Sequence, residues 1–245
     1  MPQQREATLM RSLKKSWIRF LKWQERSREP GLSALLLIEV TLIFVIIPLA
    51  GIGKMPDFVL PSMFILFVLA TLVVTSRSRF AAAVVVIAVV LSPAGAFVHA
   101  EHPSSFTEWV SLLARLLALS AVSVVIARAV FGPGRVTLHR VQGAIVLYLN
   151  IALVFVTLYR FLNTLVPDAF HGLPPSGSEY GSGAALLYFS FSTLTTVGYG
   201  DIYPLYPLAR NLANLEAVIG QLFPATLLAR LISLEIEYRR HSKSS

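Results

Sequence analysis

The chain has 245 residues, of which 55% are hydrophobic and 14% charged, and its mean hydropathy is +0.68. A polypeptide of this composition could not stay soluble, so we expect it to lie in a lipid bilayer. The sequence has no cysteine, which excludes disulfides, thiol nucleophiles and cysteine metal sites.

The first 31 residues predict a helix that lies on the inner membrane surface. Residues 1–30 contain eight Lys and Arg side chains. At about 100° per residue, these lie opposite an apolar face that includes Trp17 and Phe20. Such a segment is suited to binding anionic lipids, and a basic, disordered leader is the alternative. We therefore expect the net charge of +8 to favour binding to membrane lipid and not to nucleic acid.

Six apolar runs are each long enough to cross a bilayer as a helix. We therefore expect an all-α integral membrane protein. The runs lie near residues 33–50, 58–75, 80–98, 109–131, 141–163 and 206–233.

One cluster of glycine and proline, Gly132-Pro133-Gly134, resembles a domain boundary. It separates four predicted helices from a second membrane unit. The expected division is a basic cytoplasmic segment at 1–31, a four-helix membrane domain at 32–131, a cytoplasmic linker at 132–140, the second membrane unit at 141–234 and a short cytoplasmic tail at 235–245.

The distribution of positive charge predicts the orientation. With the N-terminus inside, seventeen of the twenty-one Lys and Arg residues lie at inner helix ends and inner loops. This asymmetry follows the positive-inside rule. We expect a multi-pass protein of the cell membrane with both termini in the cytoplasm.

The second membrane unit contains a segment too short to span. Residues 164–183 are rich in proline and glycine and predict an irregular outer loop. We expect this loop to be solvated rather than to bind a metal ion. Residues 184–195 then form an apolar, hydroxyl-bearing stretch that predicts a re-entrant helix. The C-terminal end of that helix would carry partial negative charge, which favours a cation beyond it.

The residues after this short helix are suited to binding a bare cation. An ion that crosses a membrane must exchange its water shell for other oxygens, and backbone carbonyls supply them. Gly198 and Gly200 permit positive φ at every second position, so that successive carbonyls can turn to one side. Thr196 would add a hydroxyl at the inner end, while Val197 and Tyr199 would point backwards and brace the strand.

This stretch, Thr-Val-Gly-Tyr-Gly-Asp at 196–201, resembles the selectivity filter of potassium channels. The resemblance extends over about residues 141–233, so the second membrane unit is similar to the pore domain of bacterial six-helix potassium channels. It implies that K⁺ ions bind to the carbonyls of Thr196, Val197, Gly198 and Tyr199 and to the Thr196 hydroxyl. One strand lines a quarter of such a pore, so we expect a homotetramer.

The resemblance also implies a support behind the filter, formed by Gly200, Asp201 and an aromatic residue of the short helix. The family usually has a Trp-Trp pair there, whereas this chain has Tyr188-Phe189. The Tyr188 hydroxyl can donate a hydrogen bond to Asp201, but Phe189 cannot donate. The stiffness of the filter therefore stays open, and simple packing of Tyr188 is the alternative.

Two residues of the sixth helix predict a gating hinge. Pro224 cannot donate to the carbonyl of Gly220, and glycine weakens the same turn. The family commonly has its hinge glycine at this distance from the filter, and a static kink is the alternative. Below the turn, one apolar stripe is suited to lining and closing the pore; it consists of Leu228, Ala229 and Ile232.

The first four helices resemble the sensor half of such channels in layout only. Voltage-sensing members carry arginine at every third position of the fourth helix, whereas residues 109–131 have only Arg115 and Arg128. Strong voltage gating is therefore not expected. By depth, the charges predict a Glu39–Arg128 pair and an Arg115–Glu216 pair. A proton or ion path through Glu39 is the alternative.

The predicted function is a potassium-selective channel, and the alternative is a weakly selective cation channel gated by lipid, pH or tension. No His-Glu-x-x-His or Gly-x-Ser-x-Gly motif is present, so an enzyme is not expected. Eleven residues follow Leu234, too few for a ligand-binding domain. The gating stimulus therefore stays open among lipid, pH, tension and a separate regulatory subunit.

Overall fold

The computed structural model describes residues 33–53, scattered positions between 56 and 70, and residues 105–132, 137–174 and 179–243. The predicted lipid-binding leader at 1–31 and the predicted span at 80–98 lie outside the described residues, and the span at 58–75 lies largely outside them. Within the described ranges, four helices are long and apolar enough to cross a membrane: Ser33–Gly51, Phe106–Arg128, Arg140–Leu165 and Pro207–Leu234. The prediction of a mostly helical membrane protein is confirmed, while the count of six spans stays a prediction.

The first of these helices contains a π-helical turn. It includes the π-helix η1 (Leu42–Ile46), followed by α2 (Ile47–Gly51). Pro48 has no N–H to donate to the carbonyl of Phe44, so the regular hydrogen-bond ladder cannot continue through this turn. A wider turn immediately before the proline is one way in which a helix accommodates that loss.

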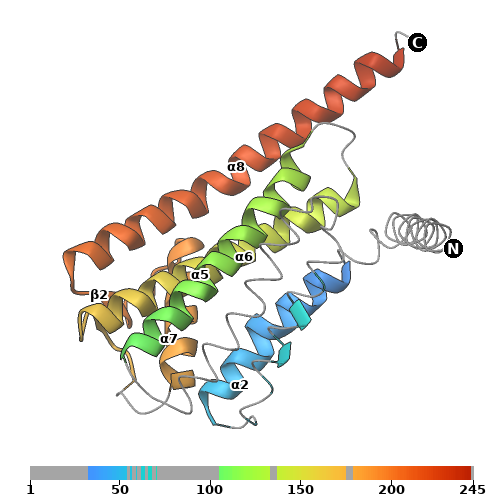
Figure 1. Cartoon of the computed structure of the whole chain (residues 1–245). Coiled ribbons are helices and arrows are strands. Elements are labelled where there is room, and N and C mark those ends of the chain that lie inside the picture. The colour runs from blue at the N-terminus through green and yellow to red at the C-terminus, as the bar shows by residue number, and fades with distance from the viewer. Residues whose placement is uncertain are drawn as a thin grey trace, which may run out of the picture.

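Two long helices form the centre of the molecule. Figure 1 shows α5 (Ser105–Phe131) and α6 (Leu138–Leu165) side by side, and they pack against each other along their length. Within this pair, Asn150 Nδ2 donates to the Leu119 carbonyl at 3.0 Å and to Ser123 Oγ at 2.7 Å. An interhelical hydrogen bond of this kind fixes the register of two membrane helices.

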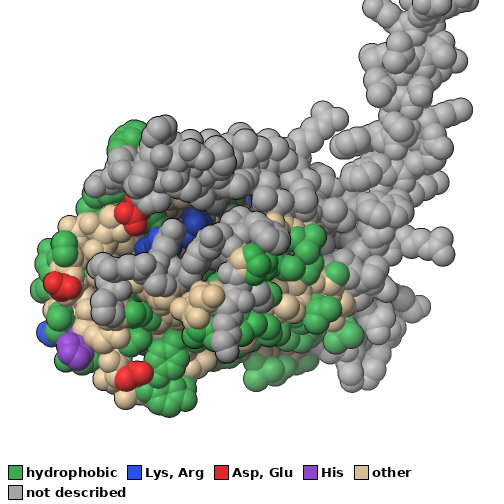
Figure 2. Space-filling view, turned by 90° about the horizontal axis from the view of Figure 1, so that it is seen from below, with side chains coloured by type: hydrophobic (Ala, Val, Ile, Leu, Met, Phe, Trp, Pro, Cys, Tyr) green, Lys and Arg blue, Asp and Glu red, His purple; other side chains and the backbone are tan. Residues whose placement is uncertain are grey.

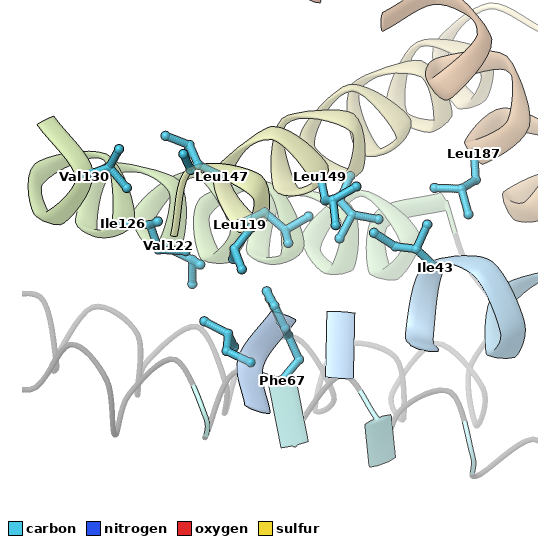
Figure 3. Close-up of a cluster of buried hydrophobic side chains, with 13 residues drawn as sticks. Ile43, Phe67, Leu119, Val122, Ile126, Val130, Leu147, Leu149 and Leu187 are labelled. Atoms are coloured by element: carbon cyan, nitrogen blue, oxygen red, sulfur yellow. The ribbon is translucent and has the colours of Figure 1, made fainter. Parts of the chain in front are cut away.

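The principal core lies where the first helix meets α5 and α6. On α5, Val122, Ile126 and Val130 recur every four residues and so lie on one face. These side chains belong to one cluster with Leu147 and Leu149 of α6 and with Ile43 and Phe67, as Figure 3 shows. This core therefore packs the N-terminal part of the described chain against the second membrane unit.

The second membrane unit has a compact outer end. After α6, the strand β1 (Phe170–His171) pairs antiparallel with β2 (Tyr203–Pro204), and His171 stacks on Tyr203. The helix α7 (Glu179–Leu194) lies between these strands in sequence, and α8 (Pro207–Lys243) follows β2 and runs along one side of the molecule in Figure 1. The outer loop is thus attached directly to the segment that follows the predicted filter.

The short helix begins earlier than the sequence predicts. We expected residues 184–195, and the structure has Glu179–Leu194. Its first turns include Gly181 and Gly183, which the prediction read as loop residues. Glycine costs helical stability but does not forbid a helix.

The predicted Glu39–Arg128 pair is wrong. Glu39 is fully buried, and neither of its carboxyl oxygens has a hydrogen-bond partner among the residues that the structure describes. Arg128 is exposed because the core face of α5 passes through Ile126 and Val130, and a residue midway between them points to the opposite side. The prediction matched Glu39 and Arg128 in depth along their helices. It did not include the direction in which each side chain points around its helix.

Candidate functional site

The backbone N–H groups of residues 197–199, which follow α7, all point toward Ser192. The amides of Val197 and Gly198 donate to the Ser192 carbonyl at 2.8 and 3.1 Å, and the Tyr199 amide donates to Ser192 Oγ at 3.3 Å. The structure contains no cis peptide bond among its described residues. In a trans peptide, the carbonyl of the preceding residue points opposite to the N–H. The carbonyls of Thr196, Val197 and Gly198 therefore face away from α7.

The backbone of this segment alternates in handedness. Positive φ occurs at Thr196 (59°), Gly198 (61°) and Gly200 (80°), and not at Val197 or Tyr199 between them. The two glycines adopt these angles without a Cβ penalty, whereas Thr196 carries some strain. The alternation expected from the Gly-x-Gly spacing is thus present, with one additional left-handed residue at the threonine.

The open side of the segment is uncovered in the single chain. Residues 195–201 are all exposed, and a Cβ added at Gly198 or Gly200 would meet nothing within 4 Å. The Tyr199 ring stacks on Tyr188 of α7, with centroids 5.8 Å apart and planes at 12°. Tyr199 thus points back toward α7 as expected, while Val197 remains 53% exposed.

The support behind the segment joins α7 to Asp201. The Tyr188 hydroxyl donates to Asp201 Oδ1 at 3.2 Å, the contact that the potassium-channel resemblance implies. The neighbouring Phe189 instead packs in a buried aromatic cluster, 5.1 Å from Tyr159 and 5.5 Å from Phe170 between ring centroids. The two aromatic residues therefore have different roles: Tyr188 donates a hydrogen bond, and Phe189 packs in the aromatic cluster.

The outer loop also packs closely against this support. Gly172 has φ of 82°, and a Cβ there would collide with the Asp201 carbonyl. A glycine is therefore required for this close approach. Sequence reasoning placed Gly172 in an irregular loop and missed the contact, because nothing local indicates which backbone lies opposite. Among the described residues, no group of three His, Asp or Glu could hold a metal ion.

The inner end of the segment contacts α8 through a residue that sequence reasoning missed. Gln221 Nε2 donates to Thr196 Oγ1 at 3.1 Å. The Tyr148 hydroxyl of α6 donates to the Leu194 carbonyl at 3.3 Å, where α7 ends. The predicted ligand hydroxyl of Thr196 is therefore tied to the helix that was predicted to carry the gate.

The predicted hinge lies beside the same carbonyl. A Cβ added at Gly220 would collide with the backbone of Leu194, so α8 crosses the end of α7 at backbone contact. The helix α8 continues through Pro224 without interruption. Gly220 thus has a packing role that the hinge prediction did not include. The predicted stripe below it is exposed in the single chain: Leu228, Ala229 and Ile232.

Glu216 does not take the partner that we predicted. It is fully buried, and its two carboxyl oxygens are bonded to the hydroxyls of Tyr159 and Ser190 rather than to Arg115. Matching depth along the helices predicted an ionic partner. The structure instead places hydroxyl groups of α6 and α7 against this face of α8.

Comparison with known proteins identifies the class of this unit. Residues 143–236 match the family model Ion_trans_2, which is described as an ion channel. The match bears out the resemblance drawn from the motif at the level of an ion channel: this part of the chain is similar to an ion channel domain. The chain is also similar to Protein LctB of Bacillus caldotenax, with 33% identity over 87 residues. The aligned region covers 35% of this chain and 64% of LctB, so it spans less than two thirds of that relative.

Proposed function

We propose that this chain is the subunit of a homotetrameric channel that conducts K⁺ passively across the cell membrane. The observation that carries the proposal is the common orientation of the filter peptides, whose amides point to Ser192 and whose carbonyls point away from α7. A column of neutral carbonyl oxygens can replace the hydration shell of a potassium ion. The ion is the cargo of the pore.

Each proposed ligand has a defined place in this arrangement. The carbonyls of Thr196, Val197 and Gly198 share one direction, and Tyr199 extends the column at the outer end. The hydroxyl of Thr196 adds an oxygen at the inner end, where Gln221 holds it. Gly200, Asp201 and Tyr188 support the column from behind through the Tyr188–Asp201 hydrogen bond.

The tetramer is supported by the exposure of the filter. Irregular backbone at membrane depth is tolerated only where protein or water covers it. Four copies around an axis would place the open faces of four filters toward one another, which satisfies this requirement. Apolar side chains cover much of the described surface in Figure 2, which is suited to contact with lipid or with further subunits.

The proposed channel is not strongly voltage-gated. Two arginines, Arg115 and Arg128, lie on α5. Arg128 lies in the last turn of α5, which leaves Arg115 as the one charge per subunit within the helix. Complete crossing of the field by one charge per subunit would supply roughly 9 kcal/mol per 100 mV in a tetramer, whereas working sensors move about three or four charges per subunit. The proposed topology keeps both termini in the cytoplasm, with residues 1–31 on anionic lipid.

Ion flux into liposomes tests the function. Purified full-length protein is reconstituted and given an inward gradient of K⁺ or of Na⁺, and the mass of the conducting species is measured in parallel. We expect a tetramer that dissipates the K⁺ gradient and leaves the Na⁺ gradient standing. Equal flux of the two ions from a tetramer would favour the weakly selective alternative, and absence of flux would contradict both.

A further inference from the structure

One carboxyl group joins the three helices of the ion channel domain. Glu216 of α8 is fully buried, one turn of helix before Gly220. Its carboxyl group is bonded to the Tyr159 hydroxyl of α6 and to the Ser190 hydroxyl of α7. Ser190 Oγ also lies 3.1 Å from the carbonyl of Ala152 on α6. Both partners of the carboxyl group are uncharged.

A count of protons decides the ionisation state of this group. The cluster contains three hydrogen bonds: Tyr159 to Glu216, Ser190 to Glu216 and Ser190 to Ala152. Each bond requires one proton. The two hydroxyls supply two, and the Ala152 carbonyl can only accept. An ionised Glu216 would leave one of the contacts as two oxygens facing each other with no proton between them.

A protonated Glu216 satisfies every contact. Its own O–H then donates to Ser190 Oγ, the Ser190 hydroxyl donates to the Ala152 carbonyl, and the Tyr159 hydroxyl donates to the remaining carboxyl oxygen. A buried carboxyl group without a cationic partner is also far less costly in its neutral form.

We propose that Glu216 is a neutral carboxylic acid that positions the pore helix α7, and that its proton is a structural part of the filter support. The proton links Glu216 to Ser190, and Ser190 lies two residues before Ser192, whose carbonyl and hydroxyl hold three filter amides. Loss of the proton would place a negative charge against the Ser190 oxygen and release α7 from α8. Glu216 therefore acts on the filter through another element, as a positioning residue.

The surroundings of Glu216 define what else could titrate. From α6, Tyr159 bonds to it directly. From α7, the contact is Ser190, which does not ionise in the accessible range. Tyr159 donates its hydroxyl proton in the arrangement above, so the proton in question is that of the glutamic acid.

Replacement by the isosteric amide is the direct test, and it rests on the proposed channel function for its readout. In Glu216→Gln, the NH₂ group can donate to Ser190 and the amide oxygen can accept from Tyr159. We expect K⁺ current to persist in Glu216→Gln. We expect it to be lost in Glu216→Asp, which keeps the acid but withdraws it from Ser190, and in Glu216→Leu, which removes the donor.

Infrared spectroscopy tests the proton without any current. The carbonyl stretch of a protonated carboxylic acid is recorded for the wild-type tetramer at neutral pH and subtracted from that of Glu216→Gln. We expect one such band to be lost, and Ser190→Ala to shift it because its acceptor is gone. The control Glu108→Gln should leave this band in place.

The outcomes separate this inference from the channel proposal. An acid band lost in Glu216→Gln with no K⁺ flux in the wild type would uphold the neutral acid and contradict the channel. Wild-type K⁺ flux with no acid band lost, or a Glu216→Gln variant that fails to assemble while Glu216→Asp conducts, would overturn the neutral acid and leave the channel standing.

Discussion

Three amide N–H groups converge on Ser192, and they set the direction of three of the four carbonyls that we propose as potassium ligands, those of Thr196, Val197 and Gly198. Two of these bonds use the serine backbone, which any residue could provide. The third uses its hydroxyl, which accepts from Tyr199. At the residue scale, this hydroxyl is therefore the side-chain group most directly responsible for the outer half of the filter.

Ser192→Ala should shorten the conducting lifetime of the filter. The substitution removes the acceptor of the Tyr199 amide and costs about 0.5–1.5 kcal/mol per subunit. We expect faster loss of current during sustained K⁺ conduction, with an intact tetramer. The measurement is the decay of macroscopic current in planar bilayers. Ser233→Ala is the control, because its hydroxyl bonds only to its own helix, and equal decay in both variants would contradict the role of Ser192.

Gly198→Ala should abolish selective conduction. The position has φ of 61° and open space around an added Cβ, so the cost is backbone strain of roughly 1–2 kcal/mol per subunit. That strain is relieved by turning the peptide, which moves a proposed ligand out of line. Gly53→Ala is matched, since Gly53 also has positive φ (68°) and open space but lies outside the filter. Selective current in Gly198→Ala would contradict the assignment.

At this scale, the motif residues and the Tyr188–Asp201 contact could be predicted, whereas the contacts of Gln221 and Gly172 could not. Thr196, Gly198 and Gly200 follow from local backbone chemistry. Ser192 carries a local signal, a hydroxyl residue in the last turn of the short helix, although its role depends on how the chain folds back. Gln221 and Gly172 carry no such signal, because each acts on a backbone that is distant in sequence.

The crossing of α7 and α8 is the element-scale feature that matters most for gating. The two helices meet with Gly220 against the backbone of Leu194, which is the last residue of α7 and lies two residues before Thr196. A movement of α8 is therefore transmitted to the inner end of the filter, both here and through the Gln221–Thr196 hydrogen bond.

Gly220→Ala should destabilise the protein through this crossing. An added Cβ collides with the Leu194 carbonyl, and overpacking of this kind typically costs about 1–3 kcal/mol. We expect a lower melting temperature for the tetramer. Gly183→Ala is the control, since it lies in α7 with nothing within 4 Å of an added Cβ. Equal melting temperatures in the two variants would contradict the close backbone contact between Gly220 and Leu194.

Pro224→Ala tests the hinge without touching this contact. The alanine regains an N–H that can donate to the Gly220 carbonyl, and this strengthens the helix by up to about 3 kcal/mol. We expect a changed single-channel open probability with unchanged ion selectivity. Wild-type open probability would mean that the hinge is placed wrongly. A variant that combines Gly220→Ala with Pro224→Ala is less informative, because the first change also disturbs α7.

Helix existence could be predicted from the sequence far better than helix direction. The bounds of α5 and α6 follow from apolar length to within a few residues, whereas α8 continues to Lys243, beyond the predicted span at 206–233 and into the predicted tail. The pairing of Glu39 with Arg128 failed because depth is readable from the sequence, whereas the direction of a side chain around its helix depends on which neighbour packs there. Glu216 shows the same limit, since its hydroxyl partners come from two other helices.

At the scale of the whole molecule, one chain is incomplete as a pore. Its filter residues are exposed, and the apolar stripe of α8 below Pro224 is also exposed. The sequence predicts this incompleteness, because it contains one copy of the motif. It does not predict the gating stimulus of the proposed channel.

The reversal potential under bi-ionic conditions tests the central claim most directly. Purified protein is recorded in planar bilayers with K⁺ on one side and Na⁺ at equal concentration on the other, with Gly198→Ala as the control. The common carbonyl orientation predicts a reversal potential displaced far toward the K⁺ equilibrium potential in the wild type, and no such selective current in the control. A wild-type reversal potential at zero would contradict a potassium-selective filter.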